Sequence, residues 1–510
     1  MSRDRPLPDR PTRNVGAVAR RVSVLVFAAV LVTPASGAAG PLDGLDQDVR
    51  HALATTATPG AAVAIVKDGK PIFVEGFGLR RAGSPERVDV HTLFSIGSLT
   101  KAFTAADIAL LVDAGKVDLD APIRRYVPTF ALEDAYRGEH ATVRDLLAHR
   151  TGLGDTNWLT VNTDLTPESI VERLAYVTPD AGFREQYLYQ NTMYMVLGQA
   201  IRNVSGLDWA SFTKERVLAP LGMVETLTHA PDAAADAAAP HLVTQGRAKV
   251  IAPLDITNVA PAGAMYSSAS DLVHWLALQV AEGNAGGLIS ARMLGEMHSP
   301  QLARKPDPYL YPDANFLAYG LAWIPWDYHG LKVVSHDGAI DGMTAKICLV
   351  PALGLGIVVL SNAEYSPVPN VIVFDALDRL TATAGTRPAR DWEAHFVPLV
   401  ALLLQERADE EAGLQKLKAH GAAVAHAPAG TFRSPLFGAV TVSTTPSQDR
   451  VLLLGRRWPL VPLTDGSFAV DVGAVGLEHA DFRLRFGPTA ADPALAITVG
   501  GHEYALRRDP

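Results

Sequence analysis

Ser98 and Lys101 stand three residues apart in the segment Ser98-Leu99-Thr100-Lys101. Residues three apart on a helix face the same way, so the amine of Lys101 comes within reach of the hydroxyl of Ser98. Residues 94–97 are typical of an extended approach, which places Ser98 where a helix begins and where backbone N–H groups favour an oxyanion. A partly desolvated lysine beside other donors can lose its proton near neutral pH and accept one from serine. The pattern predicts a nucleophilic serine at position 98.

The Ser-x-x-Lys spacing alone does not decide the matter, because it occurs twice. The second copy, Ser211 to Lys214, lies in an ordinary amphipathic helix that ends at Pro220. The chain contains no Gly-x-Ser-x-Gly, which argues against the nucleophile elbow of an α/β-hydrolase at any serine. Companion residues elsewhere in the chain must therefore distinguish the two copies.

Tyr189 and Asn191 are the first companions of Ser98. A phenol held near cations can act as general base or acid for a serine, and the amide of Asn191 can fix the lysine and a substrate carbonyl. The simpler alternative is a loop tyrosine followed by an asparagine that caps the helix beginning at Thr192. Lys101 and Tyr189 both remain candidates for the base, because neighbouring cations and phenols titrate as a coupled set.

His336 and Gly338 are the second companions, at the end of the strand-like residues 331–335. Glycine at position 338 lets substrate approach the backbone. The N–H of Ala339 can then pair with that of Ser98 as an oxyanion hole, with His336 orienting the substrate. A loop histidine whose hydrogen bonds are satisfied internally is the alternative interpretation.

Together the three motifs, in this order and with these separations, resemble the class C β-lactamase and penicillin-binding protein superfamily of serine hydrolases. The similarity covers about residues 45–385 and includes the flanking segments 143–149, 220–223 and 261–267. The resemblance implies a β-lactamase/transpeptidase-like fold and an acyl-enzyme on Ser98. The region after residue 425 resembles the lipocalin-like β domain of some esterases and D-peptide peptidases in this group, which implies a possible homo-oligomer through that domain.

Departures from the family pattern bear on the substrate. His336-Asp337 stands where β-lactamases of the superfamily carry Lys-Thr, the residues that bind the antibiotic carboxylate. If Asp337 faces the pocket, it repels an anionic group. We expect an esterase or a D-amino-acid-specific peptidase or amidase acting on a small ester, amide or short peptide. A β-lactamase or DD-carboxypeptidase is the alternative, and a non-catalytic peptide- or cell-wall-binding protein is an alternative of another class. The family usually carries Thr-Ser directly after the histidine that corresponds to His149, whereas this chain has Arg150-Thr151 there.

The elements that must position these groups form an α+β fold. Residues 63–66 and 72–74 predict a hairpin closed by Asp68-Gly69, and residues 99–114 predict a buried helix. Helical patterns and loops dominate residues 116–330, strands return at 331–335, 344–350 and 355–360, and a helix follows at 371–382. An amphipathic helix is predicted at 392–418, and the apolar period becomes two beyond it, indicating a small antiparallel sheet or barrel. The predicted organisation is a signal peptide at 1–39, a hydrolase domain at 41–385, a helix and linker at 386–428 and a β-barrel domain at 429–510.

Composition excludes several function classes. The 510 residues are 19% charged with a net charge of −9, and the basic residues are scattered, so no nucleic-acid surface is expected. The 15 histidines show no HExxH pattern and Cys348 is the single cysteine, so neither a metal nor another cofactor is predicted. No internal disulfide can form.

Residues 1–39 predict an export signal. Six arginines precede the apolar run 22–32, and small residues follow at 35–39. The apolar run is too short to predict a stable membrane span. We therefore expect a periplasmic or extracellular protein.

Overall fold

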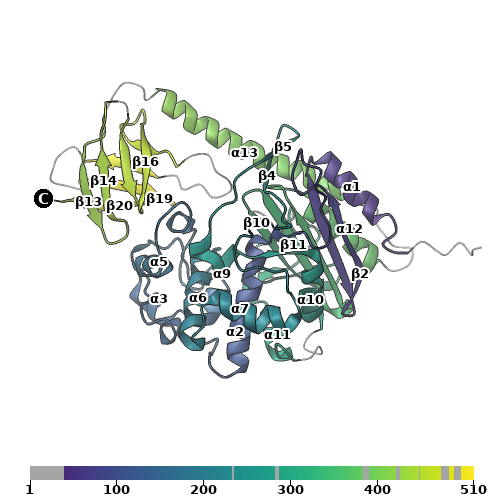
Figure 1. Ribbon diagram of the computed structural model, residues 1–510. Coiled ribbons are helices and arrows are strands. Elements are labelled where there is room, and N and C mark those ends of the chain that lie inside the picture. Colours follow the sequence, from purple (N-terminus) through teal and green to yellow (C-terminus); the bar gives the residue numbers. More distant parts are fainter. Residues whose placement is uncertain are drawn as a thin grey trace, which may run out of the picture. The chain divides into compact units, whose positions relative to one another are not determined.

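The structure is a computed structural model (Figure 1). Residues 41–510 form one compact unit. The predicted signal peptide, residues 1–39, lies outside the described residues. The structure describes residues 40–232, 235–281, 287–382, 390–420, 426–446, 448–472, 482–487 and 495–509.

An antiparallel sheet of eight strands, in the order β2-β1-β12-β11-β10-β9-β8-β7, organises the first part of the chain. The predicted hairpin is confirmed: Asp68 and Gly69 both adopt positive φ angles, 51° and 74°, as a tight two-residue turn requires. The predicted strands from residue 331 onward are confirmed as well. The strands are β1 (Gly60–Lys67), β2 (Lys70–Gly78), β7 (Leu302–Arg304), β8 (Leu317–Tyr319), β9 (Ile324–Tyr328), β10 (Leu331–Ile340), β11 (Met343–Val350) and β12 (Leu355–Ser361).

Both faces of this sheet are covered by helices, as Figure 1 shows. Successive side chains of β1 alternate between two cores, because side chains of a strand point to opposite faces. Ala61 and Val63 pack with α1 (Leu45–Thr55) and α12 (Val368–Thr381), while Ala62 and Ala64 pack on the other face. The helices of that second face include α10 (Ala269–Val280) and α2 (Thr100–Asp113).

A helical region is inserted between β2 and β7, and it confirms the predicted α+β class. It also contains two small two-stranded antiparallel sheets, β3 with β6 and β4 with β5. The helices are α3 (Ala135–His140), α4 (Val143–Leu147), α5 (Pro167–Arg173), α6 (Asn191–Ser205), α7 (Trp209–Thr213), α8 (Ala219–Leu221), α9 (Ala260–Gly263) and α11 (Ala291–Met297). The short strands are β3 (Phe94–Ser95), β4 (His241–Thr244), β5 (Arg247–Val250) and β6 (Tyr266–Ser267).

The sequence interpretation of residues 116–330 missed the strands β7, β8 and β9, which extend the main sheet. Strands of three to five residues carry too little alternation to be distinguished from loops. Their pairing in succession, β9 with β10, β8 with β9 and β7 with β8, makes them strands, rather than their own pattern.

The second part of the chain is a helix followed by a closed barrel of eight antiparallel strands. Trp392 and Phe396, at the start of α13 (Trp392–His420), are buried against Phe374 of α12. Leu402 and Leu403 farther along α13 are 57% and 47% exposed, so its apolar residues do not form the single buried face that the amphipathic prediction implied. The barrel strands are β13 (Gly430–Ser434), β14 (Gly438–Ser443), β15 (Arg450–Leu453), β16 (Arg456–Pro462), β17 (Phe468–Val470), β18 (Arg483–Phe486), β19 (Leu495–Val499) and β20 (His502–Arg508).

A search of the described helices finds none that combines the length and the apolar character needed to cross a membrane.

Candidate active site

Ser98 lies on a 3₁₀ turn, Gly97–Leu99, between strand β3 and helix α2. It is half-buried, whereas its neighbours on both sides are buried. Gly97 has a φ of +49°, and a Cβ there would lie 2.8 Å from the backbone nitrogen of Ala339. The glycine therefore allows the Ser98 turn to approach β10 closely, at the position where the sequence predicts a nucleophile.

Lys101 is fully buried, and its ammonium group donates to three acceptors. Its Nζ lies 3.0 Å from Ser98 Oγ, 2.6 Å from Asn191 Oδ1 and 2.8 Å from the carbonyl oxygen of Ala262. An ammonium has three N–H donors, so this set satisfies the charged form completely. The Ala262 carbonyl, at the C-terminal part of α9, was not predicted from the sequence.

The Tyr189 phenol meets the same serine oxygen. Its O–H donates to Ser98 Oγ at 2.6 Å, and Lys101 Nζ lies 4.5 Å from the centroid of its ring. The next residue, Gln190, fixes this segment because Thr151 Oγ1 donates to its Oε1 at 2.9 Å and its amide donates to the Leu153 carbonyl. Phenol and ammonium therefore converge on one hydroxyl.

Asn191 is the first residue of α6, and its side chain points to Lys101. It does not cap the helix, because the start of α6 has no side-chain cap hydrogen bond. While Oδ1 accepts from Lys101, Nδ2 donates to Asn157 Oδ1 at 2.9 Å. Sequence reasoning missed Asn157, since nothing in its local sequence marks it.

The His336 ring makes internal hydrogen bonds. Its Nδ1–H donates to the Asp337 carbonyl at 2.7 Å, and Nε2 accepts from the Tyr319 hydroxyl at 3.0 Å. Burial and the positive charge of Lys101 lower the pKa of His336 to about 4, so the ring is neutral at physiological pH. These contacts match the alternative of an internally satisfied histidine, and they place the ring 6.5 Å from that of Tyr189.

Asp337 forms an ion pair away from the serine. Its carboxylate lies 2.6 Å from Lys346 Nζ and accepts from the Tyr311 hydroxyl at 3.3 Å. Burial raises the pKa of Asp337, but the Lys346 charge and hydrogen bond outweigh that effect and hold it below its ordinary value. Lys346 therefore compensates the charge on which the predicted repulsion of anions depended.

The pocket at Ser98 has a different acid, Asp341, which is buried and was not singled out from the sequence. Asp337 does not line this pocket, and most of the other lining groups are apolar. The lining consists of Gly97, Ser98, Asn191, Leu254, Ile256, Val259, Ala262, Gly263, Ala339, Ile340 and Asp341.

Ala339 has the orientation that an oxyanion donor needs. The register pairs Ile340 with Met343 across the two-residue turn, and such a turn closes on a hydrogen-bonded pair. Ala339, paired with Thr344, is then in a non-hydrogen-bonded pair, and its N–H points away from β11. Beyond Ser335 that edge of β10 is not paired with β9 and lies against the Ser98 turn. The Ala339 N–H and the turn that carries the Ser98 N–H therefore lie at the same edge, and their pairing as an oxyanion hole stays a prediction.

His149 supports the site from within an aromatic cluster. Its φ is +55°, its Nδ1 accepts from the Gln190 N–H at 3.1 Å, and its ring centroid lies 4.5 Å from that of Tyr189. Burial and the Lys101 charge hold the pKa of His149 well below its usual value. Arg150 and Thr151, which stand where the family usually has Thr-Ser, follow His149 in the chain. Thr151 Oγ1 donates to Gln190 Oε1.

The second Ser-x-x-Lys copy forms no comparable site. Ser211 Oγ donates to Asp208 at 3.2 Å at the start of α7, and Lys214 is exposed. The interpretation of this copy as part of an ordinary helix is therefore sufficient.

Comparison with known proteins agrees with this arrangement. A family model described as Beta-lactamase matches residues 45–380. An unguisins hydrolase, ungD', of Aspergillus campestris is 28% identical over 92% of this chain and 92% of its own length. Penicillin-binding protein 4 of Amycolatopsis lactamdurans is 28% identical over 60% of this chain and 81% of its own length.

Two solved structures share the fold over nearly the whole chain. The octameric penicillin-binding protein homologue from Pyrococcus abyssi has a TM-score of 0.57 and 22% identity, covering 91% of this chain and 98% of its own. The crystal structure of SurE has a TM-score of 0.54 and 21% identity, covering 92% and 99%. The likeness therefore includes the C-terminal barrel.

Replacement of Gly338 by alanine should disable the site. The added Cβ would overlap the Ile96 carbonyl oxygen, so β10 must move away from the Ser98 turn and take the Ala339 amide with it. We expect kcat/KM to fall by about 100-fold, the usual effect of losing one oxyanion donor. Gly295→Ala in α11 is the matched control, because its Cβ would meet nothing within 4 Å. Equal activity of the two variants in an ester hydrolysis assay would contradict the assignment.

The stability of the protein should fall in mild acid. Folded His336 stays neutral down to its pKa of about 4, whereas the unfolded chain protonates it near 6.5. The unfolded state therefore binds the proton first, and the free energy of unfolding should decrease as pH falls from 7 to 4. This group contributes on the order of 3 kcal/mol to that decrease. Measured by urea unfolding between pH 7 and pH 4, the free energy of unfolding should decrease less for His336→Asn than for the native protein. An equal decrease in the two proteins would contradict the neutral buried ring.

Proposed function

The chain belongs to the beta-lactamase family and is a serine hydrolase, and from this premise we propose that it cleaves an ester or amide bond through an acyl-enzyme on Ser98. One observation carries the proposal. Ser98 Oγ lies within hydrogen-bond distance of both the Tyr189 hydroxyl and the Lys101 ammonium, while the serine remains accessible from a pocket. A nucleophile, a proton acceptor and a buried positive charge meet at one point.

In the reacting form Tyr189 has released its phenol proton to water, and Ser98 Oγ attacks the substrate carbonyl carbon while its own proton passes to the Tyr189 phenolate oxygen. Lys101 keeps its three acceptors throughout, so it remains the cation that stabilises the Tyr189 phenolate before that oxygen takes the serine proton. The amides of Ser98 and Ala339 stabilise the oxyanion. Tyr189 then protonates the leaving group, and a water molecule attacks the acyl-enzyme to release the acid and restore the serine hydroxyl.

For the substrate, we favour neutral or cationic esters, amides or short peptides over anionic β-lactams and peptide C-termini. Support comes from Asp341, a buried acid in the same pocket as Ser98, among lining residues that include no lysine or arginine within the described chain. Leu254, Ile256 and Val259 supply an apolar wall for an aliphatic acyl group. The relative named an unguisins hydrolase supports hydrolysis as the activity.

Ser98→Ala should abolish hydrolysis of short-chain p-nitrophenyl esters and covalent labelling by a fluorophosphonate probe. The native protein should react with one equivalent of the probe at Ser98, located by peptide mass spectrometry. Ser211→Ala is the matched control from the second Ser-x-x-Lys copy and should label as the native chain does. A native protein that the probe does not modify would instead indicate the non-catalytic binding protein.

Asp341→Asn should reduce discrimination against negative charge. The native protein should hydrolyse p-nitrophenyl butyrate with a higher kcat/KM than the anionic p-nitrophenyl hemisuccinate, by about tenfold. Two like charges about 4 Å apart repel by about 1 to 4 kcal/mol between water and a protein surface, and about 1.4 kcal/mol corresponds to tenfold. In Asp341→Asn the ratio of the two kcat/KM values should be smaller, mainly because kcat/KM for the anionic substrate rises. Equal ratios in both proteins, or rapid cephalosporin hydrolysis by the native protein, would exclude this substrate preference.

A further inference from the structure

The orientation of the Asn191 amide depends on a residue that does not touch Ser98. The Lys101 ammonium can only donate, so Asn191 must present its oxygen to it, and the NH₂ group of the same amide then needs an acceptor elsewhere. Asn157 Oδ1 can only accept, and it takes the Nδ2 hydrogen of Asn191 at 2.9 Å. With NH₂ directed to Asn157, the oxygen is directed to Lys101 at 2.6 Å. Asn157 therefore supplies the acceptor that this orientation requires and holds the Asn191 amide in place beside the ammonium.

The next residue, Trp158, is buried against the C-terminal barrel. Its ring centroid lies 5.8 Å from that of Phe437, 6.2 Å from Phe482 and 6.3 Å from Tyr504. The indole is only 6% exposed, so the barrel, rather than solvent, covers it. Asn157 and Trp158 are neighbours on one short 3₁₀ turn, Asn157–Leu159. A shift of the Trp158 backbone therefore shifts the Asn157 backbone as well.

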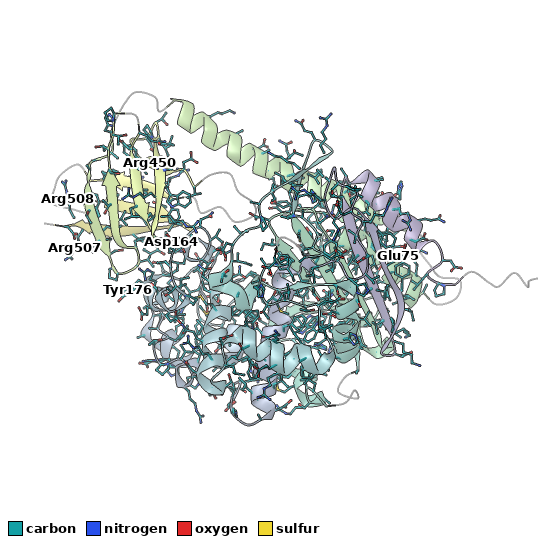
Figure 2. All side chains as sticks on the ribbon, in the orientation of Figure 1. Glu75, Asp164, Tyr176, Arg450, Arg507 and Arg508 are labelled. Atoms are coloured by element: carbon teal, nitrogen blue, oxygen red, sulfur yellow. The ribbon has the colours of Figure 1, made fainter. Side chains whose placement is uncertain are left out.

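Polar contacts attach the same loop to the barrel at its far end. Asp164, labelled in Figure 2, accepts from Arg456 Nε at 2.8 Å, and its backbone N–H donates to the Leu454 carbonyl at 3.0 Å. His502 of β20 lies 2.7 Å from Asp180 in the neighbouring loop. The barrel therefore contacts the Asn157 loop at Trp158 and Asp164 and the neighbouring loop at Asp180.

We propose that the barrel is part of the catalytic apparatus: through Trp158 it fixes Asn157, and Asn157 and Asn191 in turn fix Lys101. Asn157 and Trp158 are positioning residues, since neither touches the reacting atoms. The proposal rests on the proposed function, because it requires that Lys101 activates Ser98. It gives the barrel a role in turnover that does not depend on binding a ligand or another subunit.

The central test compares two replacements of Asn157. Asn157→Leu keeps the volume and removes the acceptor, and Asn157→Asp keeps an acceptor oxygen. We expect Asn157→Leu to lower kcat and the fluorophosphonate labelling rate of Ser98 by about 10- to 100-fold, the range expected when a catalytic group is misplaced by about 1 Å. The pH dependence of kcat for Asn157→Leu should also shift, because the Asn191 acceptor of Lys101 is no longer held in a fixed position. Asn157→Asp should restore both rates to within about threefold of native.

A pair of barrel variants tests the longer connection. Phe437→Leu removes the ring nearest Trp158, while Phe468→Leu removes a buried barrel ring whose described ring contact is with Phe486. We expect Phe437→Leu to slow Ser98 labelling at least fivefold and Phe468→Leu to label at the native rate, both measured below their unfolding temperatures.

The outcomes separate the two proposals. If the native chain is not labelled at Ser98, the proposed function fails. If the native chain is labelled and Asn157→Leu reacts at the native rate with the native pH profile, the positioning role of Asn157 is wrong. If Phe437→Leu and Phe468→Leu label equally fast, the role of the barrel is wrong.

Discussion

The buried ammonium of Lys101 is the constraint on which the rest of the site depends. A charge removed from water must find full hydrogen-bond compensation inside the protein, and Lys101 finds it in three acceptors from separate parts of the fold. One comes from the turn before α2, one from the start of α6 and one from α9. The three segments must converge for the charge to be buried with its acceptors, so the site requires the packing of α2, α6 and α9 against one another.

Two buried histidines beside this charge stay neutral. His149 and His336 lie close enough for the Lys101 charge to lower their pKa values, on top of the effect of burial. The one strong acid on the adjoining strand, Asp337, is matched by Lys346. Lys101 is consequently a single positive charge beside the hydroxyl pair of Ser98 and Tyr189, which is the electrostatic arrangement that a developing negative charge requires.

Close backbone approach is the second requirement of the site. Gly97 and Gly338 lie where the Ser98 turn meets β10, and a side chain at either would separate them. The barrel adds a third requirement from outside the family domain, because the loop that carries Asn157 packs against it through Trp158. The site therefore depends on residues from nearly the whole described chain, although its reacting groups lie within a few ångströms of Ser98.

The sequence by itself determined the residues with strong local signals: the Ser98 turn and helix, the Tyr189 and Gly338 motifs, the strands from residue 331 and the period-two barrel. These depend on spacing and periodicity within short windows, which a sequence displays directly. Only the tertiary structure decided that Ala262 and Asn157 complete the Lys101 shell, that Asp341 rather than Asp337 borders the pocket, and that Trp158 lies under the barrel. A backbone carbonyl has no residue type to recognise, and a hydrogen bond between residues far apart in the chain leaves no local pattern. Such contacts arise only when the segments pack.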